Sequence, residues 1–232
     1  MSRISLPDGI ALDDPRPIAA SAPYTYFLPH PDELAALKPG DGVKAVFRQL
    51  EGAHTYDAER MWVGVERIED GWVHGSLDNE PVGMDKLTLG DPVVLPLTHV
   101  ISTHFPNDEN PRPSTPAVRE YWDRCMVDIC VLEGRSHVDY LYRQVPDMGQ
   151  EGDKYPDSGW RFRGTDEAVE ADSNKENPFE YIAIGKVLNA DDRWLHLVDE
   201  EPGVAFQWDP DAQDYIRYDR PALLVSDLDD DQ

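Results

Sequence analysis

The chain has 232 residues, enough for one large domain or two small ones, and a formal net charge of −25. Hydrophobic residues make up 40 % of it, so it can bury a core and is not a disordered polyanion. This acidity excludes nucleic-acid binding through a basic patch, because phosphate backbones are repelled. Residues 120–232 hold 28 acids and 11 bases, against 18 and 10 in residues 1–119, so the excess lies mainly in the second half.

An acidic surface attracts a basic partner protein in a salt-sensitive way, although acidity also serves solubility alone. The first fifteen residues are broken by prolines and aspartates and do not resemble a signal peptide. No apolar stretch approaches the ~20 residues that a membrane helix needs. We therefore expect a cytoplasmic protein that contacts no membrane, and its oligomeric state stays open.

The first 105 residues predict an arm followed by a β-rich domain. Residues 1–35 are rich in proline and predict an N-terminal arm, within which residues 24–27 have strand character. The domain, residues 36–105, shows short strands about ten residues apart, typical of a small barrel or a curved antiparallel sheet. Its strands are expected at Val43–Phe47, Arg60–Ile68, Trp72–Leu77 and Asp91–Leu97. Pro92 and Pro96 predict that the last strand lies at an edge or a bulge.

Residues 106–116 hold several prolines among polar residues and predict a linker. Thr115 and Pro116 then form a typical helix start, so we expect a short helix ending near Arg124. Residues 117–225 predict a mixed domain, and residues 226–232 an acidic tail. The fold class is α+β: a small β-rich domain followed by a mixed α+β domain.

Within the mixed domain, alternating apolar positions predict five strands and a polar surface excursion at Glu167–Pro178. Residues 181–188 fit a helix or a strand, and we favour a helix. The expected strands are Met126–Leu132, Val138–Arg143, Ser158–Arg163, Trp194–Val198 and Val204–Trp208.

The hexapeptide Asp157-Ser158-Gly159-Trp160-Arg161-Phe162 is the most distinctive part of the sequence. Asp-Ser-Gly is typical of a turn, and the following alternation predicts a strand with one face in a core. Asp157 and Arg161 are expected to pair with each other, with the strand at Tyr142-Arg143, or with a partner.

No catalytic or metal-binding pattern is present. There is no G-x-S-x-G, P-loop, G-x-G-x-x-G or H-E-x-x-H, and Ser158 fits a turn serine better than a nucleophile. Cys125, Cys130 and His137 lack a usual zinc spacing, so buried structural thiols are expected. Residues 209–214 begin like a calcium loop but lack its glycine and its final glutamate, so we expect a turn. We predict no catalytic residue, metal or cofactor.

Residues from about 124 to 208 resemble a bacterial domain family grouped with polymorphic-toxin immunity proteins, immunity family thirty-three. The hexapeptide carries most of this resemblance, and Gln144-Val145 and Gln207-Trp208 depart from the family pattern. The other matching pieces are Cys125-Met126-Val127, Gly134, Val138–Arg143, Pro146, Gly164, Asp166-Glu167 and Pro202–Phe206.

Residues from about 38 to 104 resemble a second, uncharacterised bacterial domain family with no known activity. The shared pieces are Glu59–Val63, Gly75–Val82 and Leu89-Gly90-Asp91 before Val93. The distinctive part is the turn Leu77-Asp78-Asn79-Glu80-Pro81. The signature residues of both families are expected to be a scaffold rather than a binding site: Asp78, Asn79, Pro81, Tyr142, Arg143 and the hexapeptide 157–162.

The first resemblance implies an immunity protein, which binds a cognate protein toxin and occludes it. Because many toxins that act on nucleic acids carry a basic cleft, we expect an acidic surface to make the contact. The candidate residues are Asp166, Glu167, Glu170, Asp172, Asp191, Asp192, Asp199, Glu200 and Glu201, with a turn at 209–214 as a further acidic segment.

Two alternatives remain from the sequence. One is a sensor of a small molecule or protein, for which an apolar pocket lined by Trp160, Arg161 and Tyr142 would speak. The other is a hydrolase of unknown substrate, which would need a convergent cluster of perturbed carboxylates or a metal.

Overall fold

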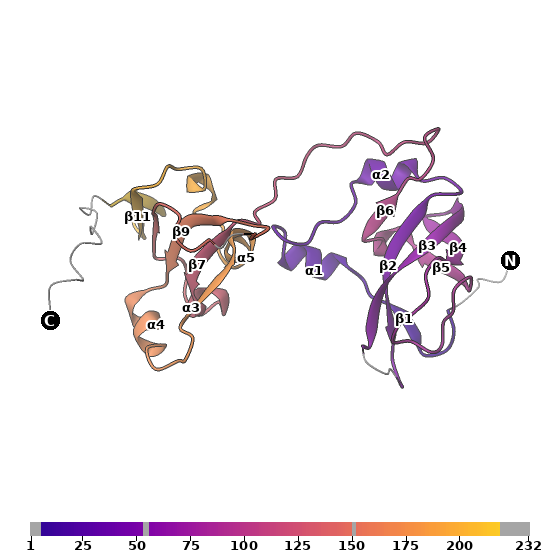
Figure 1. Cartoon of the computed structure of the whole chain (residues 1–232), viewed down its shortest axis with the longest axis horizontal. Coiled ribbons are helices and arrows are strands. Elements are labelled where there is room, and N and C mark those ends of the chain that lie inside the picture. Colours follow the sequence, from indigo (N-terminus) through magenta and orange to yellow (C-terminus); the bar gives the residue numbers. More distant parts are fainter. Residues whose placement is uncertain (1–5, 53–55, 150–151, 219–232) are drawn as a thin grey trace. The chain divides into compact units, whose positions relative to one another are not determined.

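The computed structural model describes residues 6–52, 56–149 and 152–218 (Figure 1). The chain divides into two compact units, Met1–Val118 and Arg119–Gln232, which are described separately. The acidic tail expected at 226–232 lies outside the described residues.

Unit 1 is built on a curled antiparallel sheet in the order β1-β2-β3-β4-β5, with β6 pairing to the same strand, β2, as β1 does. Its strands are β1 Ile10–Leu12, β2 Gly42–Gln49, β3 Ala58–Glu69, β4 Trp72–Leu77, β5 Pro92–Pro96 and β6 Ser102–His104. The curved β-rich domain predicted from the sequence is thus confirmed. Among the described strands, β5 pairs with β4 alone, so its two prolines lie at an edge, as expected.

The core of unit 1 follows from the alternation of β2, in which Val43, Ala45 and Phe47 are fully buried. The Leu-Asp-Asn-x-Pro turn after β4 is tied to the middle of β3. Asn79 Oδ1 accepts a hydrogen bond from the Trp62 amide at 2.7 Å, and the Asp78 amide donates to the Trp62 carbonyl at 2.9 Å. These bonds fix the turn against the sheet, which agrees with a scaffold role for Asp78, Asn79 and Pro81.

Residues 6–36 add β1 and two short helices, α1 Arg16–Ser21 and α2 Pro31–Ala36, to unit 1. The strand expected at 24–27 is wrong. The amides of Thr25 and Tyr26 both donate to the Ala22 carbonyl, at 3.1 and 2.9 Å, which closes a turn in place of an extended segment.

Unit 2 contains a six-stranded sheet in the order β10-β7-β9-β8-β11-β12. Every neighbouring pair is antiparallel except β7 and β9, which run parallel. The strands are β7 Arg124–Asp128, β8 Tyr140–Arg143, β9 Asp157–Arg163, β10 Phe179–Ala183, β11 Val204–Asp209 and β12 Asp214–Arg217. With the helices α3 Ile129–Leu132, α4 Asp166–Ala171 and α5 Ile184–Ala190, this confirms the α+β class.

Strand β9 holds the hexapeptide in the middle of this sheet, between β7 and β8. Trp160 and Phe162 point to the face that α5 covers, where the Phe162 and Trp194 ring centroids lie 4.3 Å apart. The expected strand is confirmed, but the expectation of one buried face is wrong. Arg161 on the other face is also buried, because an ion pair described below satisfies its charge.

The helix expected from Thr115 to Arg124 is absent, and residues 111–122 have neither helix nor strand. In place of a helix end, the carbonyls of Tyr121 and Asp123 accept hydrogen bonds from the amides of Gly185 and Ile184, each at 2.9 Å. These two carbonyls thereby satisfy amides at the start of α5 that have no partner within the helix.

Four other segments also differ from the expectation. The first strand ends at Asp128, and α3 begins at the next residue. The Asp128 side chain accepts bonds from Arg163 Nε and the Gly164 amide. Residues 181–188 are a strand up to Ala183, paired with β7, and a helix from Ile184. Residues 195–197 form a 3-10 turn rather than a strand, and part of the expected surface excursion is α4.

Candidate interaction surface

The hexapeptide is organised around a buried ion pair. Arg161 donates from Nη1 to Asp157 Oδ1 at 2.9 Å and from Nη2 to Oδ2 at 2.8 Å, and its second Nη2 contact reaches Asp147 at 2.7 Å. The side chains of Arg161 and Asp157 are only 6 % and 1 % exposed. Of the pairings that the sequence left open, the structure shows the one within the hexapeptide.

Burial would raise the pKa of Asp157, but its hydrogen bonds outweigh that effect and lower the pKa to about 2. The donors are Arg161 and the backbone amides of Gly159, Asp147 and Met148. The carboxylate therefore stays ionised and fixes the loop at 147–148 to the start of β9. It is a structural anchor and not a proton donor.

Ser158 and Gly159 follow Asp157 at the start of β9. Ser158 Oγ donates to the Arg124 carbonyl at 2.7 Å and accepts from the Trp160 amide at 3.2 Å, so this side chain holds the backbone. The turn expected at Asp-Ser-Gly is wrong, because all three residues belong to β9. Gly159 has φ +81°, and a Cβ there would lie 2.1 Å from the Gln144 carbonyl oxygen. Only glycine fits this position.

Arg143 and Tyr142 lie on opposite faces of β8. The Arg143 guanidinium donates to the carbonyls of Ser158 and Glu200, at 3.0 and 2.6 Å, and lies over the Trp160 ring. Arg143 thus links β8 to β9 and to the segment before β11. Tyr142 instead packs against Tyr140, with ring centroids 5.7 Å apart.

The acidic residues expected to bind a partner fall into different environments. On α4, Asp166, Glu167 and Glu170 are exposed, whereas Asp172 at its end is buried and held by Arg135 and Lys175. Hydrogen bonding from Arg135 is the main cause that lowers the pKa of Asp172. Asp172 therefore has a structural partner already.

The acidic residues after α5 divide in the same way. Asp191 is buried, accepts the Val138 amide at 2.8 Å and pairs with Arg193 at 2.7 Å. Asp199 is exposed and pairs with Arg119 at 2.5 Å. Asp192 and Glu201 are exposed, and Glu200 is half-buried.

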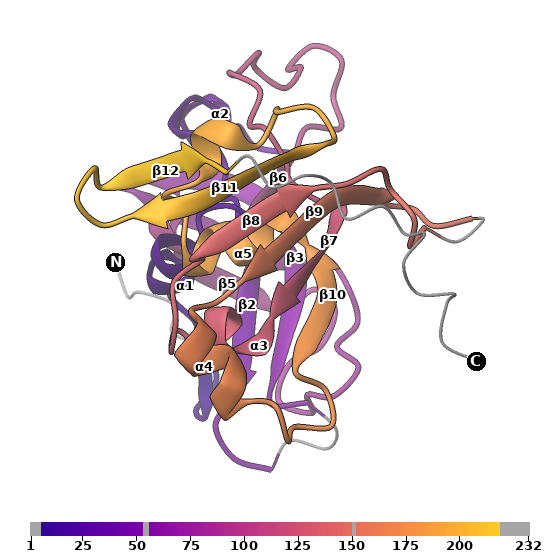
Figure 2. The same cartoon turned by 90° about the vertical axis from the view of Figure 1, so that its left-hand side faces the viewer.

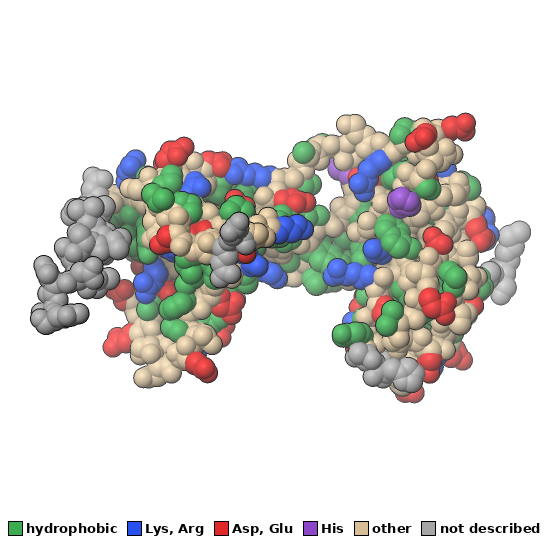
Figure 3. Space-filling view, in the orientation of Figure 1, with side chains coloured by type: hydrophobic (Ala, Val, Ile, Leu, Met, Phe, Trp, Pro, Cys, Tyr) green, Lys and Arg blue, Asp and Glu red, His purple; other side chains and the backbone are tan. Residues whose placement is uncertain are grey.

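Figures 1 and 2 both place α4 at the opposite end of the unit 2 sheet from the segment between α5 and β11. The candidate acids therefore form two separate exposed groups and two buried anchors. In Figure 3, acidic side chains are interspersed with Lys and Arg on this side of unit 2 instead of forming one patch.

A feature that the sequence reasoning missed is the second face of the unit 2 sheet. Paired residues share a face, and the register places Tyr181, Met126, Arg161 and Tyr142 in one row across β10, β7, β9 and β8. Figure 2 shows this face toward the viewer, with α5 behind the sheet. We call it the open face, because among the described residues no helix packs across it.

The open face is rich in large apolar and aromatic side chains. Phe179 on β10 is 53 % exposed and Ile216 on β12 is 49 % exposed, while Tyr140, Tyr142 and Tyr181 are half-buried. A signal was present in the sequence: Tyr140 and Tyr142, like Phe179 and Tyr181, are two residues apart. On strands whose other face is also apolar, such pairs indicate a second apolar face.

A mostly apolar groove of about 500 Å³ opens on this face between β10 and α4. Its walls include Met126, Tyr142, Met148, Val169, Phe179 and Glu170. The groove is lined by Arg161 and Tyr142, as the sensor hypothesis required, but not by Trp160, which lies on the other side of the sheet.

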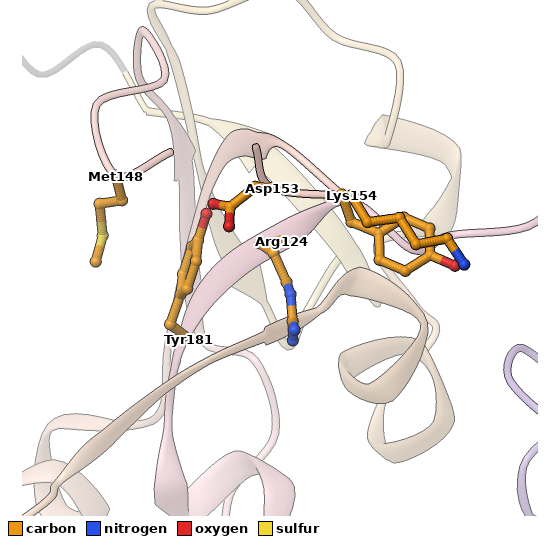
Figure 4. Close-up of a pocket in the computed structure, with 6 residues that line it drawn as sticks. Arg124, Met148, Asp153, Lys154 and Tyr181 are labelled. Carbon is orange, nitrogen blue, oxygen red and sulfur yellow. The ribbon is translucent and has the colours of Figure 1, made fainter. Parts of the chain in front are cut away.

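A smaller cavity of about 350 Å³ lies beside the start of β7 (Figure 4). Figure 4 shows the Tyr181 hydroxyl near the Asp153 carboxylate and the Arg124 guanidinium on the other side of the cavity. Within the described chain, the buried Tyr181 hydroxyl has no hydrogen-bond partner, and Arg124 lines the same cavity. Burial is the main cause that raises the pKa of Tyr181, so this hydroxyl is a neutral donor at pH 7.

The described residues contain no group of three His, Cys, Asp or Glu side chains that could hold a metal ion. Cys125 and Cys130 are free and buried, and burial raises the pKa of both thiols. The turn at Asp209–Asp214 joins β11 to β12, and Asp209 Oδ1 accepts the Asp211 and Ala212 amides. Across the described ranges, no helix is long and apolar enough to cross a membrane.

Residues 125–218 match the family model described as the Immunity protein Imm33 domain. This match begins at the second residue of β7 and ends just after β12, so it spans the whole unit 2 sheet. Residues 34–110 match a second model, DUF2314, described as an uncharacterized protein conserved in bacteria. Both predicted resemblances are confirmed. No curated protein and no solved structure matches the chain.

Proposed function

We propose that this protein is an immunity protein that binds a cognate bacterial toxin and neutralises it by occlusion. The observation that carries the proposal is the match of residues 125–218 to an immunity domain. A binding role needs no catalytic group, and the strongly perturbed carboxylate of the hexapeptide, Asp157, is a structural anchor. We place this activity in the cytoplasm, where an immunity protein meets a toxin that has entered the cell.

The exposed acids on α4 are the part of the surface that we assign to electrostatic attraction of the toxin. Asp166, Glu167 and Glu170 lie within one and a half turns of helix, and within the described residues no ion pair neutralises them. Together with the net charge of −25, they would steer a basic toxin surface toward unit 2. Asp192 and Glu201 form a second, smaller acidic group. The buried Asp172 and Asp191 support the fold beneath these groups.

The test is co-expression of the full chain with each protein encoded next to its gene, scored for growth. We expect one neighbouring protein to stop growth when expressed alone and to be tolerated when this chain is present. A variant with Trp160→Ala, which damages the fold, is the control for rescue by a folded immunity protein. Growth arrest by a neighbour that this chain never relieves would contradict the proposal.

A further inference from the structure

We propose that the toxin binds to the open face of unit 2, with a large apolar side chain in the groove between β10 and α4 and a neighbouring Lys or Arg beside Glu170. This inference rests on the proposed function and names the surface and the chemistry of the contact. Neither the acidic composition nor the family match assigns this face.

Phe179 is the exposed apolar side chain at this groove. A phenylalanine that is 53 % exposed at the wall of an apolar groove leaves surface that a partner would remove from water. Met126, Met148 and Tyr142 line the same groove, and methionine and tyrosine side chains suit a binding surface because they adapt or present rigid area.

The charge of the groove selects its occupant. Each cation near it already has a carboxylate: Arg161 pairs with Asp157, and Arg163 pairs with Asp128 at 2.7 Å. Asp172 is likewise engaged by Arg135 and Lys175. Among the described residues, Glu170 is the groove carboxylate with no hydrogen bond or ion pair. An incoming Lys or Arg would therefore find one unneutralised charge, which favours a basic segment over an acidic one.

The cavity at Arg124 and Tyr181 extends the same surface. Tyr181 neighbours Met126 in the row across the sheet, and Met148 lines both the groove and the cavity. The Tyr181 hydroxyl, which has no partner among the described residues, would donate to a carbonyl oxygen of a bound chain segment that enters this cavity (Figure 4). The open face thus offers an apolar site, one negative charge and one hydrogen-bond donor.

The experiment measures the affinity of the full chain for the neighbouring-gene protein whose toxicity it relieves, by calorimetry. Phe179→Asp should weaken binding at least about 100-fold and Phe179→Ala about tenfold, because a central apolar anchor carries much of such an interface. Leu89→Asp is the matched control, since Leu89 is 57 % exposed in unit 1. Its affinity should stay within about twofold of wild type.

Glu170→Lys should weaken binding about tenfold and reduce its salt dependence. Glu176→Lys, at an exposed residue of unit 2 outside the groove, should change the affinity little. Unchanged thermal unfolding of Phe179→Ala would show that the loss is not a folding defect.

The outcomes separate the two proposals. A neighbour that binds the wild type and Phe179→Asp equally would overturn the open face as the toxin site while leaving the immunity function intact. A shift in oligomeric state with Phe179→Asp and unchanged toxin binding would assign the groove to a second copy, which also overturns it. If no neighbouring protein binds, both the proposed function and this surface fail.

Discussion

Arg161 and Asp157 form a two-pronged ion pair four residues apart in one strand, buried in the centre of the unit 2 sheet. Side chains at i and i+4 of a regular strand lie on the same face but about 13 Å apart, beyond direct contact. Here the left-handed Gly159 and the shifted register between β7 and β9 bring them together. The most distinctive motif of the sequence therefore stabilises the start of β9.

Asp157→Asn should destabilise unit 2 by about 3–5 kcal/mol, because it leaves the buried Arg161 guanidinium with only the exposed Asp147. Asp199→Asn, which breaks the exposed pair with Arg119, should cost less than about 1 kcal/mol. Hydrogen exchange of β9 amides in urea measures both values within unit 2. Similar costs for the two variants would contradict the structural role of the buried pair.

The same pair predicts a loss of stability in acid. The folded pKa of Asp157 is about 2, below its ordinary value of 3.8, so its contribution is complete above about pH 5. That contribution, about 2 kcal/mol, is lost as the pH falls from about 4 through 2.

The measurement is the free energy of unfolding of unit 2 from pH 7 to pH 2, for the wild type and for Asp157→Asn. The difference between the two proteins should shrink below about pH 4. A difference that is constant down to pH 2 would show that Asp157 does not titrate with folding.

Gly159→Ala should cost about 3 kcal/mol, since it combines a left-handed backbone with a Cβ 2.1 Å from the Gln144 oxygen. Gly134→Ala is the matched control: its φ is +68° but nothing lies within 4 Å of its Cβ, so about 1 kcal/mol is expected. Thermal unfolding of the two variants compares the steric clash with the backbone cost. Equal shifts would mean that the strand start is not tightly packed.

Trp160→Ala should cost about 3–5 kcal/mol, because the indole is fully buried against Phe162 and donates from Nε1 to the Val198 carbonyl at 3.1 Å. Phe179→Ala, on the open face, should cost less than about 1 kcal/mol. Chemical denaturation of both variants tests this contrast. A cost for Phe179→Ala near that of Trp160→Ala would show that the open face is part of the core.

Charge reversal on α4 should affect binding and leave folding intact. The triple variant with Lys at 166, 167 and 170 should weaken toxin binding at least tenfold at low salt, and less at high salt. Asp172→Lys should instead reduce the melting temperature, since it removes a buried partner of Arg135. An unchanged affinity of the triple variant would contradict the role of the acidic helix.

The sequence predicted the strands with regular alternation, such as β2, β4 and β9, and it gave the pairing of Asp157 with Arg161 as one of three alternatives. It failed where tertiary hydrogen bonds override local preference, as at residues 121–123, whose carbonyls cap α5. The acidic set was read from charge alone, so the buried anchors Asp172 and Asp191 were not distinguished from the exposed acids. The spacing of Tyr140 and Tyr142, and of Phe179 and Tyr181, indicated a second apolar face, but only the strand order shows that these residues lie together on one side of the sheet.

Binding of the toxin to the open face of unit 2 is tested most directly by hydrogen–deuterium exchange. The full chain is compared with and without the toxin whose growth arrest it relieves. We expect slower exchange in unit 2, at β10, β7, α4 and the segment around Met148. Protection confined to residues 6–110, or a complex that leaves unit 2 unchanged, would contradict it.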